Sequence, residues 1–326
     1  MATGSSTRIV IIALAANLAI ACAKFAGYLW TSSSAMLSEA IHSLVDTSNQ
    51  ALLLYGTKSS QRPADAQHPF GYARELYFWS FVVAILLFSL GAGISFYEGV
   101  EKLLNPHPIT DPWVNYIILA LALVIEGFAT SAAIREFNSR RGTTRIVRAL
   151  RDSKDPSLFT ILLEDVAAIS GLVVAFFGVL IAHVFEAPAA DGIASLAIGC
   201  VLALVALFIA IEVKALLIGE SAKPEVQRGI AKLILAEKMR NGHILAINEI
   251  RTMQLGARDI LVAASVDFDD TTSAADVKAA TQRLESEIRA AYPDVRKFFI
   301  EVQAAADHTA MLQTGVAGAV STAIKP

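Results

Sequence analysis

The sequence predicts a membrane all-α bundle of six transmembrane helices, followed by a small cytoplasmic α+β domain with the element order αββαβ. Three observations predict this fold. The chain of 326 residues is 55% hydrophobic and only 17% charged, far from the composition of a soluble domain. It contains six apolar segments long enough to cross a bilayer. From about Pro224 the composition becomes that of a soluble protein, with short alternating and amphipathic runs.

Six apolar segments carry the membrane prediction. A crossing needs roughly 20 mostly apolar residues. Six segments meet this length: about 8–30, 36–57, 73–100, 113–136, 157–185 and 190–218. The length of the first segment and the further segments behind it favour a retained helix over a cleaved secretory signal. An even number of crossings places both ends of the bundle on one side.

The distribution of basic residues predicts the orientation. Lys and Arg gather in the loops after the second and fourth segments: Lys58, Arg62, Arg74, Arg135, Arg140, Arg141, Arg145, Arg148, Arg151 and Lys154. The opposite loops, TSSS, NPHPITDP and EAPAAD, contain neither. Because cytoplasmic loops carry the excess of positive charge, both termini are predicted to be cytoplasmic. This topology signal accounts for the Arg-rich loop, so no nucleic-acid binding is assigned to it.

The soluble part alternates between helical and strand patterns. A helical pattern to residue 239 is followed by the alternating runs INEIRTMQLG and DILVAASVDF, a second helical pattern and the run VRKFFIEVQ. This order suggests one sheet with helices on one face. The predicted domains are a transmembrane domain over 1–222, a cytoplasmic domain over 223–303 and a flexible tail over 304–326, where periodicity is lost.

The second apolar segment contains the polar stretch SEAIHSLVDTSNQ. A 3-4-3 spacing places four of its polar residues on one helical face: Glu39, His42, Asp46 and Asn49. Ionisable groups cost several kcal/mol each in hydrocarbon unless they are paired. His42 and Asp46 are one turn apart and could reach a single divalent cation through imidazole nitrogen and carboxylate oxygen. Interhelical hydrogen bonding is the alternative, but a His and an acid together favour a functional site.

The fifth apolar segment offers a partner for this stripe in FTILLEDVAAISG, which contains Glu164 and Asp165. Adjacent residues point about 100° apart on a helix, so the two acids cannot face one site equally well. Two carboxylates and one imidazole would hold a divalent cation with about neutral net charge. Protons compete for the same atoms, which would couple metal export to proton entry.

Two further ionisable residues lie within the predicted helices. Lys24 is about six residues from the outer end of the first segment, close enough to reach the surface, and it is assigned no role. Glu126 lies deeper, in LALVIEGFATS. It could relay protons or hydrogen-bond His42, and structural pairing is an equal alternative. Glu39 and Asn49 are likewise candidates for a proton relay or for supporting the metal ligands.

These residues together resemble the cation diffusion facilitator family of divalent-metal/proton antiporters. The resemblance covers about residues 8–303. Its most specific parts are SSSAMLSEAIHSLVDTSNQALLLYG, RPADAQHPFGYAREL, GARDILVAASVDFD and YPDVRKFFIEVQ. The pairing of HSLVDTSNQ with LLEDVAA is most similar to the subgroup of mitochondrial zinc-transporter-like members and their bacterial relatives. The resemblance implies a homodimer, a ferredoxin-like soluble domain and alternating access.

The resemblance also implies which residues bind metal. Three family ligand positions carry suitable side chains: His42, Asp46 and Asp165. The fourth falls on Ile161, which cannot bind metal, so Glu164, Asn49 or water are the candidates to replace it.

A second family site, on the loop after the second helix, would use an Asp and two His. Here Asp65 and His68 are in place, but the third position is Tyr72. This site is expected to be weakened or lost, and the alternative role for Asp65 is simple capping of a turn. No well-formed metal cluster is expected in the soluble domain, whose last strand reads FFIEVQ.

The predicted function is efflux of a divalent transition-metal cation in exchange for protons, and the protein is not expected to be an enzyme. Zinc is the first choice, and Fe²⁺, Mn²⁺ or Co²⁺ also suit imidazole and carboxylate ligands. The alternatives are a non-transporting metal sensor or scaffold of the same fold and, ranked lower, a membrane metalloenzyme. The expected partners are membrane lipid, metal ions and a second copy of the chain, without nucleic acid. The expected location is a bacterial inner membrane.

Overall fold

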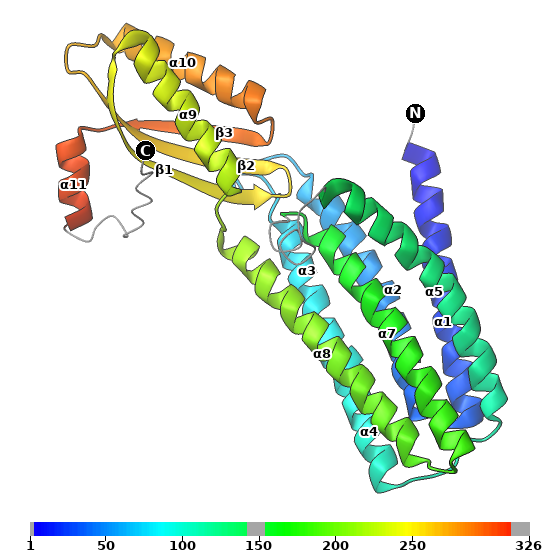
Figure 1. Ribbon diagram of the computed structural model, residues 1–326. Helices are drawn as coiled ribbons and strands as arrows, with labels where there is room; N and C mark the ends of the chain where they lie inside the picture. Colours follow the sequence, from blue (N-terminus) through cyan, green and yellow to red (C-terminus); the bar gives the residue numbers. More distant parts are fainter. Residues whose placement is uncertain (1–2, 142–153, 314–326) are drawn as a thin grey trace. The chain divides into compact units, whose positions relative to one another are not determined.

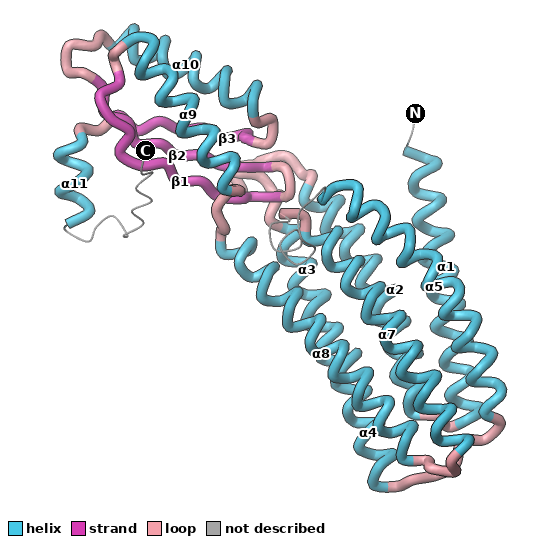
Figure 2. Tube along the Cα trace, viewed as in Figure 1, coloured by secondary structure: helices cyan, strands magenta, loops and turns pink. Residues whose placement is uncertain are grey.

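The computed structural model describes residues 3–141 and 154–313 (Figure 1). The chain divides into two compact units, Met1–Lys214 and Ala215–Pro326. The described elements of the first unit are helices, and the second unit combines helices with one sheet (Figure 2). The boundary that the sequence predicts between the transmembrane and cytoplasmic domains, at residues 222 and 223, stays a prediction.

Helices cover each of the six predicted apolar segments. They are α1 (Thr3–Thr31), α2 (Ser34–Ser60), α3 (Glu75–Leu86), the π-helical turn η1 (Leu87–Ala92), α4 (Gly93–Leu104), α5 (Pro112–Arg141), α7 (Pro156–Val184) and α8 (Ala189–Ile218). The elements α3, η1 and α4 follow one another without a break and form the third segment. Figure 1 shows these helices as long rods that lie side by side.

Within the described residues, four stretches of helix are long and apolar enough to cross a membrane: Glu75–Leu104, Pro112–Ser131, Pro156–Val184 and Ala189–Ile218. The helices α1 and α2 have 29 and 27 residues. At a rise of 1.5 Å per residue each is about 40 Å long, which exceeds the hydrocarbon thickness of a bilayer. The polar stripe reduces the hydrophobicity of α2. Four apolar helices are therefore observed, and six crossings remain a prediction.

The helix α2 is surrounded by other helices. It packs against α1, α3, η1, α4 and α7, while α5 packs against α1 and α7. As a result the polar stripe of α2 is kept away from lipid, and Glu39, His42 and Asn49 are all buried. Side chains in such a place must find their partners on neighbouring helices.

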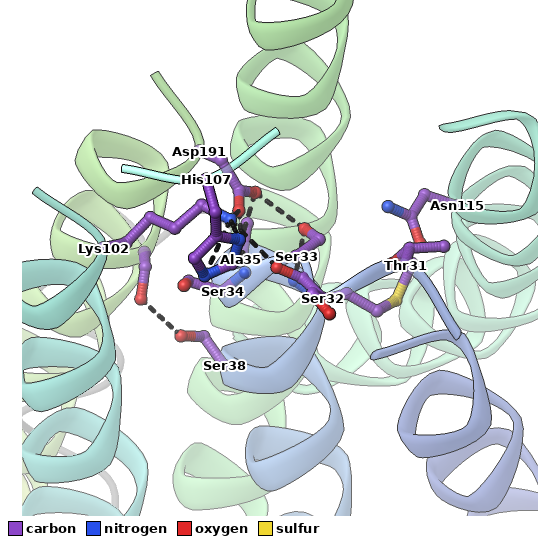
Figure 3. A network of polar contacts seen from close by, with 12 residues as sticks. Thr31, Ser32, Ser33, Ser34, Ala35, Ser38, Lys102, His107, Asn115 and Asp191 are labelled. Atoms are coloured by element: carbon purple, nitrogen blue, oxygen red, sulfur yellow. Dashed lines mark hydrogen bonds and ion pairs between the residues drawn. The ribbon is translucent and has the colours of Figure 1, made fainter. Parts of the chain in front are cut away.

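The start of α2 is held by an acid from another helix. Only two residues connect Thr31, the last residue of α1, to Ser34, the first of α2. The Asp191 carboxylate, in the first turn of α8, accepts hydrogen bonds from the Ser33 hydroxyl at 2.6 Å and the Ser34 N–H at 2.7 Å (Figure 3). A negative charge here stabilises the otherwise unpaired N–H groups and the positive dipole end of α2.

Lys102, near the end of α4, completes this network (Figure 3). Its ammonium lies 3.7 Å from the Asp191 carboxylate and donates to the Ser32 carbonyl at 2.9 Å. Both charged side chains are fully buried. The pair therefore joins α2, α4 and α8 at one end of the bundle, and removal of either partner would leave the other as an unpaired buried charge.

The second unit contains a three-stranded sheet with the order β1-β2-β3. Its elements are α9 (Pro224–Asn241), β1 (Ile244–Gly256), β2 (Asp259–Phe268), α10 (Ala274–Ala291), β3 (Val295–Val302) and α11 (Ala305–Gln313). The strands β1 and β2 pair antiparallel as a hairpin, whereas β2 and β3 pair parallel because α10 connects them. A small α+β domain is confirmed, and its order up to β3 is the predicted αββαβ.

Alternation along β2 builds the core of this unit. Every second residue of the strand is buried: Ile260, Val262, Ala264, Val266 and Phe268. These side chains share one core with Ile234 of α9 and with Leu284 and Ile288 of α10. Because α9 and α10 contact each other as well as the sheet, both helices cover the same face.

The tail predicted over 304–326 differs from the structure in its first part, where Ala305–Gln313 form the helix α11. The stretch AADHTAMLQ contains several good helix formers. The Ala305 N–H donates to the Asp267 carboxylate of β2 at 2.9 Å, which anchors the start of the helix. Small residues and missing periodicity concealed this helix because it buries no apolar face. Residues 314–326 lie outside the described residues.

Replacing Asp191 with Ala should lower the free energy of unfolding by about 3 kcal/mol, because Lys102 would become an unpaired buried charge. Denaturant unfolding in detergent micelles, followed by tryptophan fluorescence, measures this change. Asp111 serves as the control, since its hydrogen bond to Trp30 is exposed, and Asp111→Asn, which tolerates the left-handed backbone of this position, should cost less than about 1 kcal/mol. Equal effects of the two variants would show that the Asp191 network does not stabilise the bundle.

Replacing Leu284 with Ala should destabilise the second unit by about 2–5 kcal/mol, since this fully buried side chain fills the core between α10 and the sheet. Hydrogen exchange of the full chain should show faster exchange in β2 and α10. Leu235 of α9 is 46% exposed and provides the control. If Leu235→Ala accelerates exchange as much as Leu284→Ala, the described core is not what holds the unit together.

Candidate cation site

A cavity of about 290 Å³ lies between α1, α2, α5 and α7. The residues that line it include Asn17, Asp46, Gln50, Glu126, Ile161 and Asp165. Three of these are acids, and each comes from a different helix. The volume has room for several waters or for a partly hydrated cation. Asp46 and Asp165, predicted to share one site from α2 and α7, thus face the same space.

A chain of hydrogen bonds positions the Asp46 side chain. Gln50, one turn later on α2, donates from Nε2 to Asp46 Oδ2 at 3.1 Å. Asn17 of α1 donates in turn to Gln50 Oε1 at 3.0 Å. These bonds fix the carboxylate at the cavity wall. Sequence reasoning did not single out Gln50, although its i+4 spacing from Asp46 is a signal of such a bond.

Glu164 and Asp165 face different surroundings, as their angular separation on a helix requires. Asp165 lines the cavity. Glu164 is 1% exposed and accepts a hydrogen bond from Asn49 Nδ2 at 2.6 Å. Both acids still interact electrostatically with Asp46. The structure therefore places Asp165 in the cavity and Glu164 beside it.

His42 is buried next to the cavity and is not part of its lining. The residue lies one turn before Asp46 on α2 and is 1% exposed. Neither ring nitrogen has a hydrogen-bond partner among the described residues. A buried imidazole without a partner is costly. A ligand that binds one of the His42 ring nitrogens would therefore stabilise the folded protein.

The interpretation of Lys24 as a residue that reaches the membrane surface is wrong, because its side chain is fully buried. Its ammonium donates to Glu39 Oε2 at 3.0 Å, to Ser43 Oγ at 2.8 Å and to Glu126 Oε1 at 2.9 Å. The helix α1 is thus turned so that this residue faces α2 and α5. Distance from the helix end did not decide the orientation of Lys24. Two buried acids on neighbouring helices, which would have no counter-charge without it, did.

Glu39 lies between Lys24 and α7. Its Oε1 rests against Gly171, where there is no room for a Cβ atom. This absence of a side chain on α7 lets the buried carboxylate fit between the helices. The Glu126 carboxylate contacts Lys24 and forms no hydrogen bond with His42, which matches the structural-pairing alternative for that residue.

The surroundings of the cavity carry more negative than positive groups. Five acids gather there: Glu39, Asp46, Glu126, Glu164 and Asp165. In the part of the chain that the structure describes, Lys24 is the basic side chain in this group, and it contacts two of the acids, Glu39 and Glu126. Buried carboxylates without counter-charge are costly, so this arrangement requires bound protons or cations.

The chemistry of these side chains suits a divalent cation, since carboxylate and imidazole are its usual ligands. Among the described residues, however, no three His, Cys, Asp or Glu side chains are grouped closely enough to hold a metal as they stand. Binding would therefore require side chains to move toward the cation.

The predicted second site lies on the loop between α2 and α3. Asp65 accepts hydrogen bonds from the Gln67 and His68 N–H groups at 3.0 and 2.7 Å and from the Tyr72 hydroxyl at 2.6 Å. These bonds, that of Tyr72 above all, hold the pKa of Asp65 below its ordinary value. The carboxylate caps a turn, which is the alternative weighed from the sequence. Metal binding by Asp65 and His68 stays a prediction.

Comparison with known proteins identifies relatives of this chain. Residues 10–218 match the cation efflux transmembrane domain. The human protein named "Proton-coupled zinc antiporter SLC30A9, mitochondrial" is 36% identical over 266 residues, which are 80% of this chain and 46% of that protein. "Metal tolerance protein C4" of Arabidopsis thaliana is 30% identical over 270 residues, 81% of this chain and 57% of that protein. The chain spans about half the length of these relatives.

These relatives correct the predicted location. An integral membrane protein is supported by the family and by the apolar helices. The bacterial inner membrane is overturned, because the human relative is named as mitochondrial and the second relative is a plant protein. Apolar length identifies segments that cross a bilayer, and loop charges identify which side of the bilayer each loop faces. Neither signal identifies which cellular membrane it is.

The names of these relatives also bear on the choice between transport and catalysis. Both the family description and the human relative's name are those of transporters and not of enzymes, which argues against the metalloenzyme alternative. The matched domain contains all the buried acids of the cavity. The chain belongs to the cation efflux family, the cation diffusion facilitators, and lies close to its SLC30A9-like subgroup.

Proposed function

We propose that the protein exports a divalent transition-metal cation in exchange for protons, and that this cation is zinc. The observation that carries this proposal is the cavity of about 290 Å³ that Asp46, Glu126 and Asp165 line from three helices. Acids placed in this way can bind a cation jointly, whereas acids that turn to separate neighbours cannot. His42 and Glu164 lie next to the cavity and are further ligands after a small movement.

Proton coupling follows from the charge of the site. The carboxylates and the imidazole bind metal in their deprotonated forms. When the metal leaves, protons restore the charge balance that buried acids require. The same groups therefore carry either the metal or protons, and alternating access of the cavity to the two sides of the membrane would convert this competition into antiport.

The choice of zinc rests on ligand chemistry and on similarity. Oxygen and nitrogen ligands also suit Fe²⁺, Mn²⁺ and Co²⁺. The human relative is named as a zinc antiporter, which favours zinc among these ions for this chain.

The proposed assembly is a homodimer whose protomers each cross the membrane six times. Both termini lie on the side of the Arg-rich loop, as the positive-inside rule predicts. The second unit is proposed to be ferredoxin-like, supported by its αββαβ order and mixed three-stranded sheet. The π-helical turn η1 within the third segment is a place where a helix can bend during alternating access.

Asp46→Asn and Asp165→Asn should each lower zinc-driven proton flux by about 100-fold, since each removes a charged oxygen from the cavity while it keeps the side-chain volume. Proteoliposomes that contain a pH-sensitive dye measure this flux after zinc is added. Asp111→Asn, on an exposed loop at the end of the helices, is the control and should leave the flux unchanged. Wild-type flux in both cavity variants would exclude the cavity as the transport site.

Zinc affinity should fall as the pH is lowered, because protons compete with zinc for the same carboxylates and imidazole. Titration calorimetry in buffers with different ionisation enthalpies measures the number of protons released for each zinc bound. Asp46→Asn should release fewer protons than the wild-type protein. Zinc binding without proton release at any pH would contradict the exchange mechanism.

A further inference from the structure

Lys24 and Glu126 form an ion pair at the wall of the cavity. Lys24 Nζ lies 2.9 Å from Glu126 Oε1. The second oxygen, Glu126 Oε2, is buried and has no hydrogen-bond partner among the described residues. Glu126 belongs to the cavity lining, and Lys24 does not. One oxygen of the acid is therefore engaged by the ammonium, while the other is left for a further ligand.

One position in the lining of the same cavity is apolar, although an acid at this position could bind a cation. Ile161, one turn before Asp165 on α7, lines the cavity with a side chain that cannot bind a cation. Glu126 lines the cavity from the neighbouring helix α5, and its carboxylate interacts electrostatically with those of Asp46 and Asp165. Asp46 and Asp165 are already proposed ligands, and Glu126 is the third acid of the described lining. It can therefore supply the oxygen that Ile161 does not.

We propose that Glu126 is a ligand of the transported cation and that Lys24 is a tethered cation that holds Glu126 while the cavity is empty. A divalent cation that enters draws Glu126 away from Lys24. When the cation leaves, the ion pair forms again, and this competition favours release. The inference rests on the proposed function and adds to it a ligand and an internal competitor for that ligand.

The contacts of Lys24 make such an exchange physically reasonable. After Glu126 leaves, the ammonium still has the Glu39 carboxylate at 3.0 Å and the Ser43 hydroxyl at 2.8 Å. The buried charge is therefore not left unpaired, which would be strongly destabilising. A lysine ammonium is a compact charge on a flexible stem and can follow its remaining partners. Lys24 acts through Glu126 and is a positioning residue.

Two substitutions should change zinc affinity in opposite directions. Lys24→Met removes the competitor, so zinc should bind about tenfold more tightly. Glu126→Gln removes the ligand, so zinc should bind about tenfold more weakly. Titration calorimetry of the purified full chain with zinc chloride measures both. In proteoliposomes, Lys24→Met should also lower both KM and kcat, because slower release of the cation limits turnover.

Three further variants separate this role from a structural one. Lys24→Arg keeps the charge and should retain wild-type zinc affinity. Lys24→Met combined with Glu126→Gln should bind zinc as Glu126→Gln does alone, because Lys24 no longer has a ligand to compete for. Lys102→Met is the matched control, since it removes the other fully buried lysine ion pair of the helical unit that the structure describes. It should lower stability and leave zinc affinity unchanged.

The outcomes distinguish this inference from the proposed function. If the wild-type protein binds zinc and moves protons but Lys24→Met and Lys102→Met have the same zinc affinity, the tethered-cation role is wrong. If Lys24→Met does not fold, unchanged zinc affinity in Glu126→Gln alone overturns the inference. A wild-type protein that neither binds zinc nor moves protons would instead overturn the proposed function.

Discussion

Excess negative charge, buried among apolar helices, is the constraint on which the rest of the structure depends. Acids from α2, α5 and α7 surround one cavity, and within the described residues Lys24 from α1 is the basic side chain beside them, in contact with Glu39 and Glu126. A protein that only needed stable helix packing would gain more from apolar side chains in these places. In the proposed function, positive charge that occupies the cavity in turn, as metal or as protons, offsets the cost of these acids.

The architecture around the cavity limits how these acids can move. The start of α2 is fixed by Asp191 of α8, and the middle of α2 is joined to α1 through Lys24 and Asn17. Gly171 lets α7 approach closely enough to pack against Glu39. Rigid contacts thus lie at the end and along the side of α2, while the cavity itself is open space. Small side-chain movements there are compatible with a stable bundle.

Much of the helical unit could be predicted from the sequence because its signals are strong. Apolar length predicted where the helices lie, and the 3-4-3 spacing in α2 predicted one buried polar face. Adjacent residues point about 100° apart on a helix, which predicted that Glu164 and Asp165 would not share one environment. In the structure Asp165 lines the cavity and Glu164 bonds to Asn49. Element order in the second unit was equally clear, since alternating and amphipathic runs differ in period.

The remaining features depend on contacts that a single sequence does not reveal. The orientation of Lys24 is decided by acids on two other helices, and the role of Asp191 depends on the place where α8 meets the start of α2. The helix α11 has no apolar face, so periodicity could not predict it. Which membrane holds the protein is not encoded in apolar length or loop charge at all.

The central claim is that acids from different helices bind one cation in this cavity. An experimental structure of the full chain with zinc, with the metal located by anomalous scattering at its absorption edge, tests this claim most directly. The account predicts a single zinc peak in the cavity, within bonding distance of both Asp46 and Asp165. A cavity without zinc, with the metal bound elsewhere such as at Asp65 and His68, would contradict it.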